Sequence, residues 1–552
     1  MGSDTPAFDY ESARNNFTFD LPEYFNFAID VVGKRAREND KTALIAIDRS
    51  GKNVEHLSYS DLDRASNKFA NVLMDLGVEK GDFAFVMIPR LPSWYHVLFG
   101  AMKVGAVSMP GTNLLTAKDV EYRINRAGAK LAIVTKEHAD KVDQVKSNCP
   151  TLQHLIVIGE DRDGWTGFDS ACAAASDELD LAKAPQVRAD DLMLIYFTSG
   201  TTSMPKMVGR DHSYGAAHGI TGDYWADLKE DDVHWTLTDT GWAKAAWGLM
   251  FPPMLAGSTV LLYDGEGFDV DMHLKIIEQH RVTTFCAPPT IYRILAQTDV
   301  SHADLSSLRH CIGAGEPLNP EAMRSWKAST GCDVYDGYGQ TETVNIVANY
   351  PGMEIRPGSM GKPVPGVDVN IVDDAGNIVG DDEVGHIAVR LTDPYPPGLF
   401  KGYFKDDEGT ARAFHDGWYF TGDTATRDSD GYFWFVGRSD DIITSSGYRI
   451  SPFEVESALV EHEAVAESAV VSKPDPARTE IVMAYVTLAP GFEASQDLKQ
   501  DIQDFVKNLT APYKYPREIV FMEALPKTIS GKIRRVELRD EAKEHTAGSI
   551  TP

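Results

Sequence analysis

The sequence has little cysteine, no long apolar run and no leading apolar segment. Its 552 residues include 5 cysteines, none in a C-x-x-C pair. This spacing argues against structural zinc and is typical of reduced thiols in a reducing compartment. No stretch approaches about 18 uncharged apolar residues, the length that a membrane-spanning helix needs. The first residues also lack the basic and apolar segments of a secretory signal. We therefore expect a cytoplasmic protein without a membrane span.

The sequence is also short of basic residues. It has 53 Lys and Arg against 82 Asp and Glu, a formal net charge of −29. Nucleic acids and anionic membrane surfaces select basic protein surfaces, so neither is an expected partner. A polyanionic small molecule would have to bind at a local basic cluster.

What the sequence does contain is an alternation of helical and strand-like segments. A chain of this length is too long for a single hydrophobic core and should divide into several units. Its content of 43% hydrophobic and 24% charged residues is typical of a globular protein. Helical periodicity is seen at 60–76, and buried-strand candidates lie at 83–88, 131–134, 155–158 and 192–197. The alternation predicts layered α/β sheets whose strands are largely parallel.

Two changes of pattern predict boundaries. After Pro357 the chain is rich in Gly and β-branched residues, which predicts a smaller β-rich subdomain at about 357–439. Ser451-Pro452-Phe453-Glu454 reads as a capped helix start within a segment large enough to fold as a small α+β unit. We therefore predict an N-terminal domain at 1–439 and a C-terminal domain at 440–552.

One loop is the first candidate for chemistry. An apolar stretch leads into Thr-Ser-Gly-Thr-Thr-Ser-Met-Pro-Lys at 198–206. Such a turn offers backbone N–H groups, hydroxyls and a cation to a polyphosphate, although it lacks the spacing of a Walker A loop. Gly200 permits close approach of the backbone, and Pro205 restricts Lys206. Taken alone, the run fits a phosphate loop and an ordinary Ser/Thr-rich turn equally well.

Four later motifs decide between these readings. They are Asp-Gly-Tyr-Gly-Gln-Thr-Glu at 336–342, Tyr-Phe-Thr-Gly-Asp at 419–423, Gly-Arg-Ser-Asp-Asp at 437–441 and Pro-Lys-Thr-Ile-Ser-Gly-Lys at 526–532. With the loop they resemble, in order, the motifs of the AMP-forming adenylating enzymes: acyl-CoA synthetases, luciferases and adenylation domains. The resemblance runs from about Leu57 to Arg539. Pro205-Lys206-Met207 and Ser446-Gly447-Tyr448-Arg449 look most like medium-chain acyl-CoA synthetases. Ser203 stands where the family usually has Gly, from which we expect altered loop mobility.

The resemblance implies an ATP site. It places Glu342 on Mg²⁺, Thr341 on the α-phosphate, and Asp423 with Arg438 at the ribose. Without the resemblance, Glu342 would be read as a solvated carboxylate and Tyr338 as a structural aromatic. The remaining residues assigned to the phosphates, the adenine and their motifs are Thr198, Ser199, Gly200, Thr201, Thr202, Lys206, Gly315, Glu316, Pro317, Asp336, Gly337, Tyr338, Gly339 and Gln340.

The resemblance also implies a moving C-terminal lid. Lys532 would bridge the attacking carboxylate and the α-phosphate, a task suited to a compact flexible cation. Asp440 would be the hinge. After rotation, coenzyme A would meet the lid at Gly447, Tyr448, Arg449 and Arg478.

The acid pocket is the least specified part. Candidate lining residues, each of which could equally be simple core, are Trp242, Trp247, Gly248, Tyr338, Val344 and Ile346. An apolar, aromatic lining suits a medium-chain fatty or aromatic carboxylic acid. The expected function is therefore an ATP- and Mg²⁺-dependent acid–CoA ligase that forms acyl-AMP and then acyl-CoA. A short- or branched-chain acid, a carrier-protein acceptor and a non-catalytic adenylate-binding module are the alternatives. Self-association into a homodimer stays open.

Overall fold

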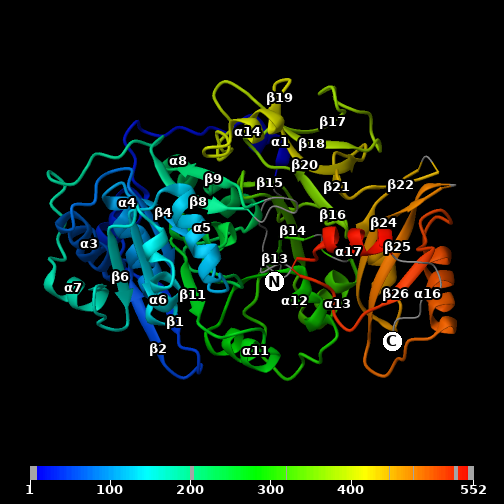
Figure 1. The fold of residues 1–552 in the computed structure, drawn as a ribbon, viewed down its shortest axis with the longest axis horizontal. Helices are drawn as coiled ribbons and strands as arrows, with labels where there is room; N and C mark the ends of the chain where they lie inside the picture. Colours follow the sequence, from blue (N-terminus) through cyan, green and yellow to red (C-terminus); the bar gives the residue numbers. More distant parts are fainter. Residues whose placement is uncertain are drawn as a thin grey trace.

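A computed structural model describes residues 9–198, 204–316, 318, 320–446, 448–476, 478–527 and 532–544. Within these residues the strands form three sheets, of 7, 14 and 5 strands, which follow one another roughly along the chain (Figure 1). The prediction of a mixed α/β fold with large sheets and a small C-terminal domain is confirmed. None of the described helices is long and apolar enough to cross a bilayer.

The first sheet has the strand order β7-β6-β5-β3-β4-β8-β9 and is parallel except for the β8–β9 pair. Its strands are β3 (Phe83–Met87), β4 (Val107–Pro110), β5 (Leu131–Thr135), β6 (His154–Ile158), β7 (Thr166–Gly167), β8 (Leu192–Phe197) and β9 (Met207–Asp211). The strands predicted at 83–88, 131–134, 155–158 and 192–197 are thereby confirmed. The helices of this region are α3 (Tyr59–Asp75), α4 (Pro92–Lys103), α5 (Ala117–Ala127), α6 (Lys136–Asp143), η2 (Lys146–Asn148) and α7 (Phe168–Ala174).

Helix α3 shows how local sequence sets these elements. Ser58 accepts a hydrogen bond from the backbone of Asp61, whose side chain accepts one from the backbone of Ser58. This reciprocal capping box satisfies two N–H groups that a helix start would otherwise leave unpaired. The apolar face of the helix is buried, so the helix predicted at 60–76 is confirmed.

The largest sheet has a parallel part and an antiparallel part. Strands β1, β11, β10, β12, β13 and β14 are parallel neighbours, with β2 antiparallel at the edge. Beyond β14 the order continues β15-β16-β21-β20-β18-β17, all antiparallel. The bounds are β1 (Thr42–Ile47), β2 (Val54–Ser58), β10 (Val233–Thr236), β11 (Thr259–Tyr263), β12 (Thr284–Ala287), β13 (His310–Gly313), β14 (Val334–Gly339), β15 (Asn345–Ala348), β16 (Ser359–Pro363), β17 (Val369–Val372), β18 (Gly385–Arg390), β19 (Phe414–His415), β20 (Trp418–Arg427) and β21 (Phe433–Arg438).

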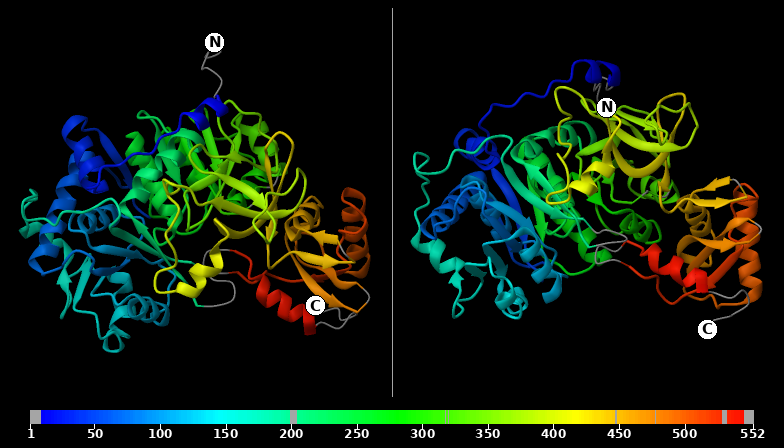
Figure 2. Two further views of the ribbon diagram at one scale, coloured as in Figure 1. Left: turned by 90° about the horizontal axis from the view of Figure 1, so that it is seen from above. Right: turned by 45° about the horizontal axis from the view of Figure 1, so that its top comes forward.

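The β-rich segment at 357–439 thus continues the same sheet rather than forming a separate one. The N-terminal arm reaches across to it: the Tyr10 hydroxyl donates to the carbonyl of Pro363 at 2.8 Å (Figure 2). The helices of the arm and of the large sheet are α1 (Tyr10–Asn15), η1 (Ala28–Gly33), α2 (Lys34–Glu38), α8 (His212–Ala217), η3 (Thr221–Trp225), α9 (Ala243–Ala245), η4 (Ala246–Met250), α10 (Phe251–Ala256), α11 (Val270–Gln279), α12 (Pro289–Ala296), α13 (Pro320–Thr330) and α14 (Asp407–Ala413).

The third sheet lies in the C-terminal region, at the right of Figure 1. Its path is β23-β22-β25-β24, with β26 on β25. Ser451 accepts a hydrogen bond from the backbone of Glu454, so the predicted helix start at α15 is confirmed. Helix α15 contacts β21 of the large sheet. The bounds are β22 (Ile443–Ser445), β23 (Tyr448–Ile450), β24 (Val465–Asp475), β25 (Thr479–Leu488), β26 (Glu518–Phe521), α15 (Pro452–Val460), α16 (Gln496–Leu509) and α17 (Arg535–Glu544).

Candidate active site

Three of the predicted motifs meet at the large sheet. Strand β14 carries 336–339 and leads into 340–342, and the pairing of β20 with β21 sets Asp423 opposite Arg438. The predicted phosphate loop follows the end of β8, in the neighbouring sheet. The motifs are therefore brought together by sheet topology although they are far apart in the chain.

Asp423 is the centre of a buried hydrogen-bond network. Its Oδ2 accepts from the Tyr338 hydroxyl at 2.6 Å and from Gln340 Nε2 at 2.7 Å. Its Oδ1 lies 3.4 Å from Arg438 Nη1. The Tyr419 hydroxyl in turn donates to Gln340 Oε1 at 2.8 Å. Burial raises the pKa of Asp423, and the charge of Arg438 and the hydrogen bonds oppose that rise. Four residues assigned to ATP are thus joined into one rigid group.

Glu342 is held from both its side chain and its backbone. Its carboxylate Oε1 accepts from the Tyr403 hydroxyl at 3.0 Å. Its carbonyl accepts from Arg210 Nη1 and from the backbone of Phe400, each at 2.9 Å. Burial raises the pKa of Glu342, and the Tyr403 hydrogen bond and the Arg210 charge oppose the rise. Lys206, at the end of the phosphate loop, places Nζ 4.2 Å from the centroid of the Tyr403 ring.

Sequence reasoning missed both Arg210 and Tyr403. The one signal for Arg210 is its place inside strand β9, where a charged side chain needs partners. Tyr403 follows Lys401-Gly402 in a segment with no motif of its own, and only the fold brings it to Glu342.

The predicted adenine residues lie after β13 and on β14. Gly315 has φ +109°, which a residue with a side chain rarely adopts. Gly337 is packed so closely that an added Cβ would lie 2.4 Å from the Trp225 ring. Asp336 accepts a hydrogen bond from the backbone of Gly337 at 2.9 Å. Burial raises the pKa of Asp336 to about 8, so this carboxyl is protonated at neutral pH.

One of the predicted acid-pocket residues, Trp247, packs against a second tryptophan. Trp247 is partly buried, and its ring packs at 5.2 Å against Trp225, which the sequence did not single out. Gly248 is required by packing, because an added Cβ would lie 2.5 Å from Thr236. Lys244 Nζ donates to the carbonyl of Ala314 at 3.5 Å, which links this segment to the predicted adenine loop. Trp242 is partly exposed, whereas Val344 and Ile346 are buried.

The C-terminal region brings Lys532 into range of this group. The positive charge of Lys532, like that of Arg438, lowers the pKa of Asp423. Nearby, the Arg535 Nη2 donates to both carboxylate oxygens of Glu456 at 2.7 Å. The negative charge of Glu316 contributes to raising the pKa of Arg535. This end of the chain is therefore close enough to the predicted ATP residues for charges on the two sides to affect each other's pKa values.

The predicted hinge and coenzyme A residues lie at the start of the C-terminal region. The Asp440 carboxylate is 3.7 Å from Arg438 Nε. Tyr448 is exposed and stacks on Tyr513 with ring centroids 4.1 Å apart. Arg478 Nη1 donates to the Ser446 hydroxyl at 3.3 Å.

Several predicted residues lie outside the described part of the chain. They are Ser199, Gly200, Thr201, Thr202, Pro317 and Gly447, together with the side chain of Arg449. Thr198 and Lys206 border the loop, and the Thr198 backbone donates to the Lys206 carbonyl at 3.0 Å. Thr341 is partly exposed and Gly339 is exposed, next to Glu342.

Comparison with known proteins gives consistent matches over nearly the whole chain. The AMP-binding enzyme family model matches residues 33–404, and the model of the AMP-binding enzyme C-terminal domain matches residues 454–532. The chain is 44% identical to the acyl-coenzyme A synthetase ACSM3, mitochondrial, of Rattus norvegicus, over 96% of this chain and 93% of the relative. It is 43% identical to ACSM5, mitochondrial, of Homo sapiens, over 94% and 91%.

Solved structures agree. The anthranilate CoA ligase AuaEII, in complex with anthranoyl-AMP, superposes with a TM-score of 0.87 at 33% identity, covering 95% of this chain and 98% of that one. The Brucella canis acyl-CoA synthetase gives 0.73 at 36% identity, covering 97% of each chain. A benzoate CoA ligase from Burkholderia xenovorans LB400 gives 0.80 at 29% identity, covering 93% of this chain and 100% of that one.

Proposed function

Because the chain belongs to the AMP-binding enzyme family and is an ATP-dependent acyl-CoA synthetase, we propose that its substrate is a medium-chain or aromatic carboxylic acid. The reaction has two steps. The carboxylate first displaces pyrophosphate from ATP to give acyl-AMP, and the thiol of coenzyme A then displaces AMP to give acyl-CoA. The single observation that carries the assignment of the site is the Asp423 network, reached by the charge of Lys532.

In the first step the protein's task is positioning and charge neutralisation. We assign the β- and γ-phosphates to Lys206 and the loop from Thr198 to Thr202. The ribose falls to Asp423 and Arg438, because Asp423 Oδ1 retains acceptor capacity after Oδ2 has taken two hydrogen bonds. The adenine falls to Gly315, Glu316, Pro317, Asp336, Gly337 and Tyr338, and the α-phosphate to Thr341.

Glu342 fits the role of a magnesium ligand. Among the described residues no group of three or more His, Cys, Asp or Glu side chains could hold a metal ion. Mg²⁺ commonly uses one or two carboxylates and takes its other ligands from phosphate oxygens and water, which a single buried carboxylate beside a phosphate loop allows. When bound, the ion would neutralise charge on the triphosphate.

Lys532 is assigned to the reacting centre of the first step. A cation that meets both the carboxylate and the α-phosphate stabilises the negative charge that gathers there in the transition state. For the second step, rotation about Asp440 would remove Lys532 and bring Gly447, Tyr448, Arg449 and Arg478 to the coenzyme A entrance. One chain thereby uses two arrangements for two steps.

The acid assignment is supported by the Trp225–Trp247 pair, because aromatic walls suit aryl or mid-sized aliphatic chains. Two similar structures are those of an anthranilate CoA ligase and a benzoate CoA ligase. The cytoplasmic location and the homodimer stay predictions, and the relatives of known location are named as mitochondrial.

The test is acid-dependent formation of AMP and pyrophosphate from ATP, with acetate, butyrate, octanoate, palmitate and benzoate, with and without coenzyme A. A maximum at octanoate or benzoate, with thioester formed, is expected. A maximum at acetate or palmitate would contradict the proposed acid class. Pyrophosphate without thioester would point to another acceptor.

A further inference from the structure

A short segment ahead of α14 is fastened to the strand that follows the phosphate loop. The backbone of Phe404 donates to the carbonyl of Met207 at 2.8 Å, and Tyr403 forms a β-bridge with Val208. The backbone of Tyr403 also donates to the Thr410 hydroxyl at 2.9 Å. These contacts fix Tyr403 opposite Val208, two residues after Lys206 in the chain.

Arg210, on the same strand, fixes the other side of this arrangement. Its side chain is 2% exposed, and its Cζ lies 3.7 Å from the centroid of the Tyr214 ring. It donates to the backbone carbonyls of Glu342 and Gly398. In the part of the chain that the structure describes, no carboxylate forms an ion pair with it. Burial lowers the pKa of Arg210, and the nearby charges of Asp211 and Glu342 oppose that change. The direct partners of its side chain are the two carbonyls and the Tyr214 ring.

The side chain of Tyr403 serves two partners with two different parts. Its hydroxyl donates to Glu342 Oε1 at 3.0 Å, and its ring face lies 4.2 Å from Lys206 Nζ. A hydrogen bond to a charged acceptor and a cation–π contact are both orientation-dependent. One aromatic side chain thus fixes the separation between a carboxylate and an ammonium group that no direct contact joins.

We propose that Tyr403 is the positioning residue that couples Glu342 to Lys206, with Arg210 anchoring the backbone on which the coupling depends. The proposal rests on the proposed function, in which Glu342 meets the metal and Lys206 meets the phosphates. Tyr403 acts through these two residues and does not itself contact the reacting atoms. Its hydroxyl sets how ATP binding depends on Mg²⁺, and its ring sets binding of the triphosphate whether or not Mg²⁺ is present.

The two parts can be removed separately. Tyr403→Phe deletes the hydroxyl and keeps the ring, whereas Tyr403→Leu deletes both. Tyr395→Phe is the matched control: the Tyr395 hydroxyl donates to the carbonyl of Phe400 at 2.8 Å, in the same segment, but has no role toward Glu342 or Lys206 in this proposal. ATP affinity is measured by calorimetry without acid, once with MgCl₂ and once with EDTA, so that no turnover is needed.

Tyr403→Phe is expected to keep the affinity measured in EDTA and to lose about tenfold of the tightening that Mg²⁺ gives, the size of a hydrogen bond to a charged group. Tyr403→Leu should in addition lose about two- to fivefold in EDTA, the size of a cation–π contact. In pyrophosphate assays Tyr403→Phe should raise the Mg²⁺ concentration needed for half-maximal rate while the rate at saturating Mg²⁺ recovers.

Full Mg²⁺-dependent tightening in Tyr403→Phe would overturn the proposal. So would an equal loss in Tyr395→Phe, because the effect would then come from loosening of the segment as a whole. Failure of the proposed function would look different: the wild-type protein would bind ATP with the same Mg²⁺ dependence but release no pyrophosphate with any acid.

Discussion

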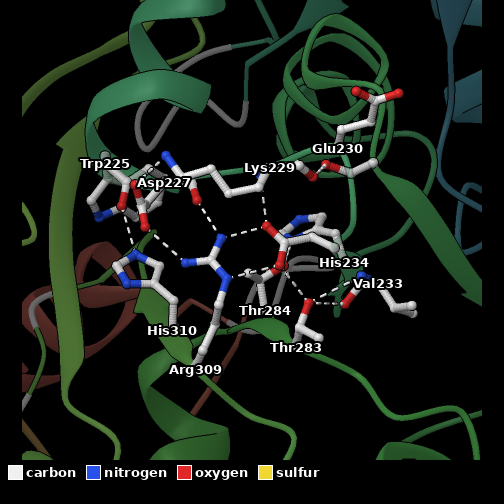
Figure 3. Close-up of polar contacts among 12 residues, drawn as sticks. Trp225, Asp227, Lys229, Glu230, Val233, His234, Thr283, Thr284, Arg309 and His310 are labelled. Carbon is white, nitrogen blue, oxygen red and sulfur yellow. Dashed lines mark hydrogen bonds and ion pairs between the residues drawn. The ribbon is translucent and has the colours of Figure 1, made fainter. Parts of the chain in front are cut away.

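The two ends of the parallel strands in the large sheet handle charge in opposite ways. At the ends where β10, β12 and β13 begin, Arg309 donates to Asp232 Oδ1 at 2.8 Å and to Asp227 Oδ2 at 2.7 Å (Figure 3). The Thr283 hydroxyl also donates to Asp232 at 2.7 Å. Arg309 is therefore paired with both Asp227 and Asp232 at this end.

At the ends where β13 and β14 stop, the pattern is different. The strands run into Gly315 and into the segment from Gly339 to Glu342, and burial raises the pKa of both Glu342 and Asp336. The cation that we assign to this end, Lys532, comes from the far C-terminal region, and its charge lowers the pKa of Asp423. Perturbed, incompletely neutralised groups are typical of functional sites, whereas paired groups are typical of scaffold. We call the end with the Arg309 ion pairs the closed end and the end with Glu342 and Asp336 the open end. The difference separates the proposed site from its supporting scaffold, and substitutions at either end can test it.

The largest effect is expected from Lys532→Ala at the open end. Loss of this cation should lower the rate of acid-dependent pyrophosphate formation by about 10²–10³, the cost of removing one transition-state stabilising group. The measurement is pyrophosphate release with the preferred acid. Conversion of supplied acyl-AMP to thioester should stay near the wild-type rate, because Lys532 is assigned only to the first step. A parallel loss in both steps would contradict that division.

Asp440→Pro tests whether the open end depends on motion. A pyrrolidine ring fixes φ near −65°, so the chain could no longer change conformation at this position. If Asp440 is the hinge, thioester formation should fall by about a hundredfold, the cost of misplacing reacting groups by roughly an ångström. Asp440→Ala, which leaves φ free, should keep both steps. Equal rates for the two variants would remove Asp440 as the hinge.

How far the sequence predicted this arrangement depended on the range of the interactions. Local signals gave helix α3 through its periodicity, the start of helix α15 through its cap, and strand β8, which leads into the predicted phosphate loop, because periodicity, caps and buried strands are set by neighbouring residues. The sequence could not reveal Tyr403 beside Glu342 or Trp225 beside Trp247, since these contacts join residues 61 and 22 positions apart. Nor did it show that the strands of 357–439 extend the large sheet, because strand pairing partners leave no local pattern.

Arg309→Met breaks the closed end and should leave the chemistry alone. Burial alone would raise the pKa of Asp232, but the hydrogen bonds from Arg309 and Thr283 outweigh it and hold that pKa below its usual value. Removing Arg309 leaves Asp232 buried without its cation, at a cost of about 2–3 kcal/mol once the partial exposure of Arg309 is considered.

The free energy of unfolding in denaturant at neutral pH measures that cost, and pyrophosphate formation by the folded variant should be unchanged. The depressed pKa of Asp232 contributes stability above the unfolded pKa, so the difference between the two proteins should shrink as the pH falls below about 4. A folded variant of normal stability but low activity would mean that the two ends are not separate.

A pH-dependent effect sharpens the comparison within the open end itself. Asp336 has a folded-state pKa of about 8, against about 4 in an unfolded chain. Between these values the folded protein keeps a proton that the unfolded chain has lost, so stability falls as the pH rises, by up to about 1.4 kcal/mol per pH unit. Asp336→Asn cannot ionise, and its stability relative to wild type should therefore increase from pH 5 to pH 7. Denaturant unfolding of both proteins at pH 5, 6 and 7 measures the difference. Parallel curves would mean that Asp336 is ionised in the folded protein and that the open end carries one more uncompensated negative charge.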